Sequence, residues 1–123
     1  MRTRWTGICL ALALQCANAS AHGIAQPKHG GLVDIGGEVT FELVRQKSGL
    51  TIHVEDHGKP VDMKGATGEL LLGSETGKRL ATLKEAGPSS VAAKPVALRS
   101  GDRLFVRITL GNGAIIVGEF AIK

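Results

Sequence analysis

The stretch Arg-Leu-Phe-Val-Arg-Ile-Thr-Leu, residues 103–110, decides the fold class of this chain. Every second residue from Leu104 to Leu110 is aliphatic and the residues between them are mixed, which is the period of a strand with one buried face. Gly111-Asn112-Gly113 follows, and glycine and asparagine accept the positive φ that a tight hairpin loop requires. We therefore expect residues 103–110 and 114–122 to form an antiparallel hairpin.

The same alternation recurs toward the N-terminus, in residues 38–45 and 50–56, which Ser48-Gly49 would join. The loop Gly87-Pro88-Ser89-Ser90 interrupts the chain later. Weaker strand candidates, bounded by this loop or by glycines, are residues 69–73, 79–85 and 96–99. About seven short strands result, which predicts an all-β fold, a small antiparallel β-sandwich of the immunoglobulin-like kind made of two sheets.

One segment, residues 78–86, also has the spacing of a short helix. Gly77 and Gly87 flank it and leave too little length for a stable helix. We therefore favour a strand here.

Three segments make up the predicted chain organisation. Residues 1–21 combine a basic start, an apolar run over residues 8–14 and the small-residue site Ala19-Ser20-Ala21, which indicates a cleaved signal peptide. Residues 22–31 are expected to form a flexible Gly/His lead-in, and residues 32–123 a single domain. We expect an exported, periplasmic protein with no membrane span after processing.

Composition excludes several functional classes. Removing residues 1–21 takes away Arg2, Arg4 and both cysteines, so the net charge falls from +4 to +2. The mature chain would then have no thiolate site, no disulfide and no basic stripe for nucleic acid. The Gly-x-Ser-x-Gly, phosphate-loop and His-Glu-x-x-His motifs are missing from the sequence, so we expect neither an enzyme nor catalytic residues.

Histidine is the most informative residue type, because all four histidines lie between residues 22 and 57. Neutral imidazole binds Cu(II), Zn(II) and Ni(II). Cleavage after Ala21 would make His22 the first residue, with its amine and ring chelating one ion. Cleavage after Ala19 would instead leave Ser20-Ala21-His22, whose amine, two backbone amides and imidazole form a square-planar set. Protons compete for both sets, so binding would weaken as the pH falls.

A second group of candidate ligands lies on one predicted strand. An extended chain returns His53, Glu55 and His57 to one face and turns Ile52 and Val54 toward the core. These three side chains are candidate surface ligands. The alternative is that the histidines are solvated side chains beside a hairpin.

Three motifs carry a resemblance to a known family: Lys28-His29-Gly30-Gly31, residues 39–44 and residues 57–62, His-Gly-Lys-Pro-Val-Asp. They resemble the small β-rich periplasmic proteins found with heavy-metal efflux systems. The chain is also similar, over residues 28–63, to the N-terminal β-domain of membrane-fusion adaptors of heavy-metal resistance-nodulation-division pumps. The adaptors' helical hairpin, lipoyl-like module and barrel have no counterpart here, so the resemblance implies a stand-alone accessory domain. The His-Gly-Gly run either supplies a ligand or is conformational, its glycines letting the chain enter the first strand tightly.

Met63 would add a soft thioether to a Cu(I) site, although a single methionine usually fills a core. The predicted metal ligands are His22, His29, His53, Glu55, His57 and Met63.

The leading hypothesis is a periplasmic metal-binding accessory protein for heavy-metal efflux or resistance. It would take Cu(II) first, with Zn(II) or Ni(II) as alternatives, and have an efflux adaptor as partner. The competing hypothesis is a metal-free interaction module that docks on an envelope efflux complex through an exposed strand edge.

Overall fold

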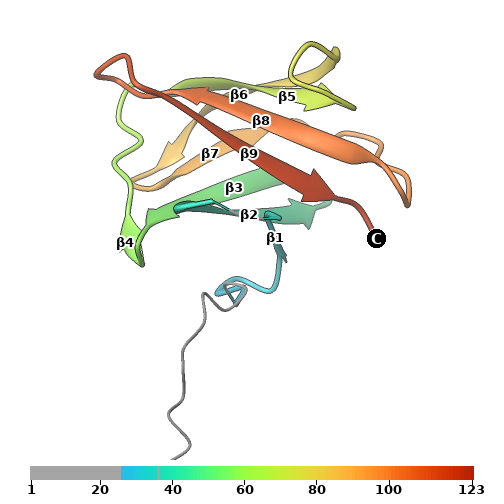
Figure 1. The fold of residues 1–123 in the computed structure, drawn as a ribbon, viewed down its shortest axis with the longest axis horizontal. Helices are drawn as coiled ribbons and strands as arrows, with labels where there is room; N and C mark the ends of the chain where they lie inside the picture. Colours follow the sequence, from blue (N-terminus) through green and yellow to red (C-terminus); the bar gives the residue numbers. More distant parts are fainter. Residues whose placement is uncertain (1–25, 36) are drawn as a thin grey trace, which may run out of the picture.

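The computed structural model describes residues 26–35 and 37–123 (Figure 1). The predicted signal peptide and His22 lie outside the described residues. Within them every regular element is a strand, so the all-β prediction is confirmed. No helix of this part of the chain is long and apolar enough to cross a membrane. The strands are β1 (Leu32–Val33), β2 (Val39–Gln46), β3 (Gly49–Asp56), β4 (Lys59–Pro60), β5 (Thr67–Leu72), β6 (Lys78–Gly87), β7 (Ser90–Ala93), β8 (Arg103–Thr109) and β9 (Ile115–Ala121).

The strands form one continuous sheet in the order β1-β2-β3-β7-β6-β5-β8-β9, with β4 paired to β3. The sheet curls on itself, and its two ends meet where the amide of Ile35 donates to the carbonyl of Glu119 at 2.9 Å (Figure 1). The result is nearly a closed barrel. Two separate sheets do not form, because β7 pairs with both β3 and β6 and so joins the two halves.

The core fills the inside of the curled sheet. Phe41 of β2 and Phe120 of β9 are its largest fully buried side chains, and buried aliphatic residues of β3, β5, β6, β7 and β8 surround them. Gly118 of β9 faces the Phe41 ring, and a Cβ atom there would lie 2.5 Å from the ring's Cδ2 atom. This close approach fixes how the last strand packs on the second.

The hairpin predicted from residues 103–122 is confirmed. Strands β8 and β9 pair from Arg103↔Ala121 to Thr109↔Ile115. Across the turn Leu110 donates to Ala114 at 2.8 Å, and Gly113 takes a φ of +89°.

Two other strand predictions are wrong. Residues 90–93 form β7 although Ser90 was placed in a loop, and residues 96–99 form no strand. The reason is pairing. Val91 lies opposite Ile52 of β3, whereas the chain beyond Ala93 passes the first residue of β3 and has no described strand beside it. Residues 78–86 lie within β6, so the choice of strand over helix is confirmed.

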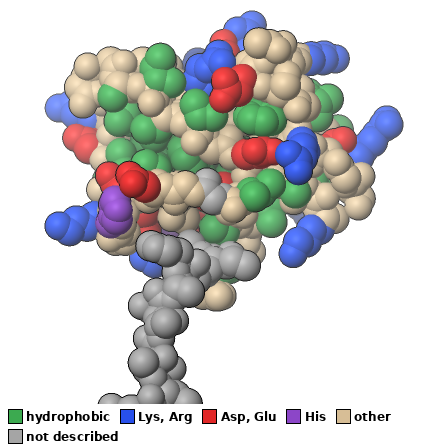
Figure 2. Space-filling view, viewed as in Figure 1, with side chains coloured by type: hydrophobic (Ala, Val, Ile, Leu, Met, Phe, Trp, Pro, Cys, Tyr) green, Lys and Arg blue, Asp and Glu red, His purple; other side chains and the backbone are tan. Residues whose placement is uncertain are grey.

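On the face shown in Figure 2, Lys and Arg side chains are scattered and do not gather in a stripe, and histidine and acidic side chains lie together near β4.

Candidate functional site

The candidate site lies on the outer face of the β2–β3 hairpin. Phe41, Ile52 and Val54 point into the core with no exposed surface. The side chains between them therefore face outward, and the register places Glu42 opposite His53 and Thr40 opposite Glu55. The predicted orientation of His53 and Glu55 is thus confirmed.

Glu42 holds the lead-in against this face. Its carboxylate accepts hydrogen bonds from the backbone amides of Lys28 at 2.9 Å, His29 at 2.8 Å and Gly31 at 2.9 Å. The ring Nδ1 of His29 lies 3.1 Å from the same carboxylate. Only 7% of the Glu42 side chain is exposed. Residues 28–31, expected to be flexible, are therefore fastened to β2.

The two glycines after His29 make this attachment sterically feasible. Gly30 has a φ of +70°, a conformation that other residues adopt only with strain. A Cβ atom at Gly31 would collide with the carbonyl oxygen of Leu43. Gly30 and Gly31 therefore have a conformational role. His29 itself stays a candidate ligand.

Glu42 is ionised at neutral pH and sets the tautomer of His29. Burial alone would raise the pKa of Glu42. The hydrogen bonds from the Gly31 amide, the His29 ring and the Lys28 and His29 amides outweigh it and lower the pKa from 4.5 to about 2. A carboxylate only accepts hydrogen bonds, so Nδ1 of His29 carries the proton. In the neutral ring, Nε2 then has a free lone pair.

The His29 ring stacks on the ring of His53. Their centroids are 3.7 Å apart and their planes differ by 5°. Desolvation lowers the pKa of His53, and the positive charge of a protonated His29 lowers it further, against the opposite effect of Glu42 and Glu55. His53 is therefore neutral at neutral pH and offers a second nitrogen donor.

Lys28 neutralises the remaining carboxylate. Its Nζ atom lies 2.9 Å from each oxygen of Glu55. The side chains of Lys28, His29, His53 and Glu55 all line one hollow of about 290 Å³ beside Glu42. In this arrangement Glu55 is paired with the ammonium group of Lys28.

The other predicted ligands lie elsewhere. His57 follows the last residue of β3, has a φ of +49° and pairs with Asp56 at 2.5 Å, so it does not line the hollow. Met63 is fully buried in the core. The structure thus brings together His29, His53 and Glu55. Among the described residues no three His, Cys, Asp or Glu side chains surround a common metal position.

Glu42 and Lys28 were not predicted as site residues. The signal for Glu42 was available, because joining residues 38–45 to 50–56 through a short turn places it across from His53. Lys28 gave no such signal, since its position depends on how the lead-in crosses the hairpin.

No protein-family model, curated protein or solved structure matches this chain. The resemblance to efflux adaptors therefore stays a prediction from short motifs.

Proposed function

We propose that this protein is a periplasmic metal-binding accessory protein that binds Cu(II), or alternatively Zn(II) or Ni(II), through His29 and His53. The observation that carries the proposal is the His29–His53 stack, in which Glu42 holds Nδ1 of His29. Export through residues 1–21 and a role in heavy-metal efflux or resistance are parts of the same proposal. They rest on the signal-like segment and on the motif resemblance.

The arrangement around His29 supports a ligand role. Metal-binding histidines commonly donate their second ring N–H to a carboxylate, which fixes the tautomer and makes the ring more basic toward the metal. Glu42 stands in that relation to His29. His53 adds a neutral imidazole, and nitrogen donors of this kind suit Cu(II).

A complete site requires a rearrangement. The two rings are parallel, so their in-plane lone pairs do not converge on one ion, and binding both nitrogens requires one ring to turn. Further donors would be the amine and ring of His22. His22 lies seven residues before His29, so the extended chain limits their separation to at most about 25 Å. Glu55 would become a ligand once Lys28 releases it.

Titration of the exported protein with Cu(II), followed by calorimetry and electron paramagnetic resonance, tests the proposal. His29→Ala and His53→Ala should each weaken binding at least about tenfold and remove nitrogen couplings from the spectrum, because each removes a donor. His57→Ala is the matched control and should leave both readouts unchanged. Binding should also weaken below about pH 6.5, where protons compete for imidazole. If all three variants bind Cu(II) as the parent does, the site is elsewhere and the proposal is wrong.

Lys28→Met gives a second, opposite test. The variant keeps the backbone amide that binds Glu42 but removes the ammonium group from Glu55. We expect tighter Cu(II) binding, because a carboxylate becomes available and a nearby positive charge is lost. Weaker binding would show that Lys28 supports the site and does not compete with the ion.

A further inference from the structure

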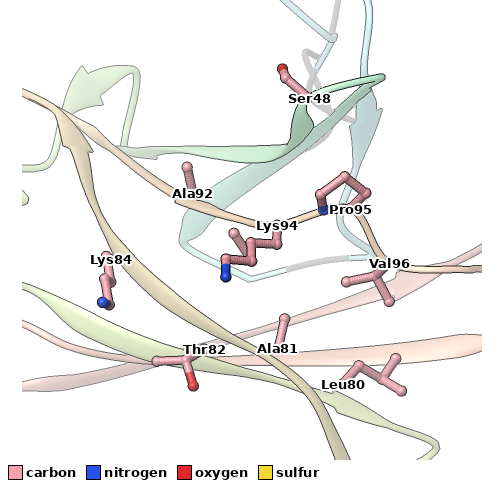
Figure 3. Close-up of a pocket in the computed structure, with 10 residues that line it drawn as sticks. Ser48, Leu80, Ala81, Thr82, Lys84, Ala92, Lys94, Pro95 and Val96 are labelled. Atoms are coloured by element: carbon pink, nitrogen blue, oxygen red, sulfur yellow. The ribbon is translucent and has the colours of Figure 1, made fainter.

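A second hollow, distant in sequence from the histidine site, opens between β6 and the end of β7 (Figure 3). It has a volume of about 560 Å³, within the range of ligand-binding clefts. Its apolar lining includes Leu80 and Ala81 of β6, Ala93 of β7 and Val96 beyond β7, all of them half-buried against the core.

The hollow exists because β6 and β7 pair over only part of their length. They pair at Lys84↔Ala92, Glu85↔Val91 and Gly87↔Ser90 and then diverge, as Figure 3 shows. Residues 78–83 of β6 pair with β5 on one side, with a bulge at Leu80, and with no described strand on the other. One strand edge therefore faces the hollow with backbone groups that take part in no ladder.

The segment across the hollow is also without a strand neighbour. Residues 96–99 alternate between half-buried and exposed, the burial pattern of an extended chain, yet they belong to no described strand. Val96 at its start lines the hollow opposite β6. The sequence pattern that wrongly predicted a strand here thus marks a segment suited to pair with one.

The charge of the hollow is one-sided. Lys84 and Lys94 line it, no acidic residue does, and neither lysine forms an ion pair within the described part of the chain. In Figure 3 the Lys94 side chain lies between the two diverging strands.

We propose that this hollow binds an extended, acidic peptide segment of a partner protein, which adds as a strand along residues 79–82 of β6. In such strand addition, main-chain hydrogen bonds supply affinity, and alternate side chains enter pockets. Here the apolar lining would receive alternate aliphatic side chains of the peptide, and the two lysines would pair with its carboxylates. Four residues of peptide span about 13 Å of strand. The inference does not depend on the metal proposal, because none of its residues belongs to the histidine site.

A panel of six-residue acetylated peptides tests this proposal. Each peptide alternates Val and Thr and carries one Glu. Each is compared with two variants: a Lys twin, which has Lys in place of Glu, and a methylated twin, in which alternate backbone amides carry a methyl group. Nuclear magnetic resonance titration of the full chain should show shifts at residues 79–84 and 92–96 with the Glu peptides. The Lys twins should bind about tenfold more weakly, and methylation should abolish binding, because it blocks the ladder.

Protein variants and a competing ligand complete the test. The double change Lys84→Glu and Lys94→Glu should make the protein prefer the Lys peptides over the Glu peptides. Lys78→Glu is the control, because it makes the same substitution at a residue that does not line the hollow, and it should leave the preference for Glu peptides unchanged. Decanoate serves as an anionic amphiphile. Binding of decanoate but of no peptide would assign the hollow to lipid-like ligands and overturn the proposal. Equal binding of methylated peptides, or the absence of shifts with the whole panel, would overturn it as well.

Discussion

Replacing Glu42 with Gln should release the lead-in from the β2–β3 hairpin. In the parent protein one carboxylate accepts hydrogen bonds from the amides of Lys28, His29 and Gly31 and from the His29 ring. Glutamine has the same shape but only one accepting oxygen, and its NH₂ group would face donors. The variant therefore leaves part-buried N–H groups without an acceptor.

The pKa of Glu42 sets the magnitude. It lies at about 2, against an ordinary value of 4.5. Because one pKa unit corresponds to about 1.4 kcal/mol, ionisation of Glu42 favours the attached lead-in by about 3 kcal/mol. A folded-state pKa below the unfolded one contributes stability above pH 4.5 and loses it as the pH falls through about 2. The loss of lead-in stability caused by Glu42→Gln should therefore be largest at pH 7 and should disappear as the pH falls through about 2.

Amide hydrogen exchange measures this directly, since the lead-in can open without global unfolding. At pH 7 the amides of Lys28, His29 and Gly31 should exchange more than about 100-fold faster in Glu42→Gln, which corresponds to 3 kcal/mol. Glu38→Gln is the matched control, because Glu38 is an exposed acid on the approach to the same strand. Amides of the β8–β9 hairpin should keep their protection in both variants.

Two results would refute the reasoning. One is protection of the three lead-in amides within about twofold of the parent at pH 7, which would mean that the carboxylate does not hold them. The other is an equal loss of protection at pH 7 and below pH 3, which would assign the effect to altered packing instead of to the charge of Glu42.

Two further predictions concern the stack and the core. His53 should titrate below its ordinary pKa of 6.5 in a nuclear magnetic resonance pH series, and His29→Ala should raise that value by removing both the cover and the neighbouring charge. Because folding lowers the pKa of His53, the neutral ring contributes stability at neutral pH, and this contribution is lost as the pH falls below 6.5. An unchanged His53 pKa in His29→Ala would contradict the stacking of the two rings. Gly118→Ala should cost about 1–3 kcal/mol in urea unfolding, because its Cβ meets Phe41, and Phe41→Leu should recover part of that loss. The exposed Ala121→Val change is the control, and equal costs at both positions would refute the contact.

The strand pattern could be predicted where one face of a strand meets the core. Alternation located β2, β3 and β8 to within one residue at each end, and the Gly111-Asn112-Gly113 turn located β9 as the partner of β8 equally well. Pairing could not be predicted in the same way. Residues 96–99 alternate too, but a strand also needs a neighbour, and β3 begins at Gly49, so no described strand lies beside the chain beyond Ala93. The single curled sheet likewise depends on β7 bonding to two strands, which no local pattern specifies.

The site was predictable in part for the same reason. His53 and Glu55 follow from the alternation of β3, and His57 was placed with them only because the pattern does not show that β3 ends at Asp56. His29 was proposed from a motif, but its contact with His53 joins residues 24 positions apart. Glu42 looked like an ordinary outward side chain of β2. Its burial arises from the lead-in crossing the hairpin, a contact between segments that local sequence cannot reveal.

Glu42 connects the folding of the lead-in to the chemistry of the site. The carboxylate that fastens residues 28–31 also accepts a hydrogen bond from Nδ1–H of His29 and so leaves Nε2 free. Glu42→Gln would therefore disturb attachment and metal binding together. Lys28 separates the two effects, because its backbone bonds to Glu42 and its side chain to Glu55. A change confined to that side chain alters the charge beside the histidines and leaves the attachment intact. If Lys28→Met changes the metal affinity while the lead-in amides stay protected from exchange, the change therefore comes from the site itself. It does not come from a change in the order of the segment that covers the site.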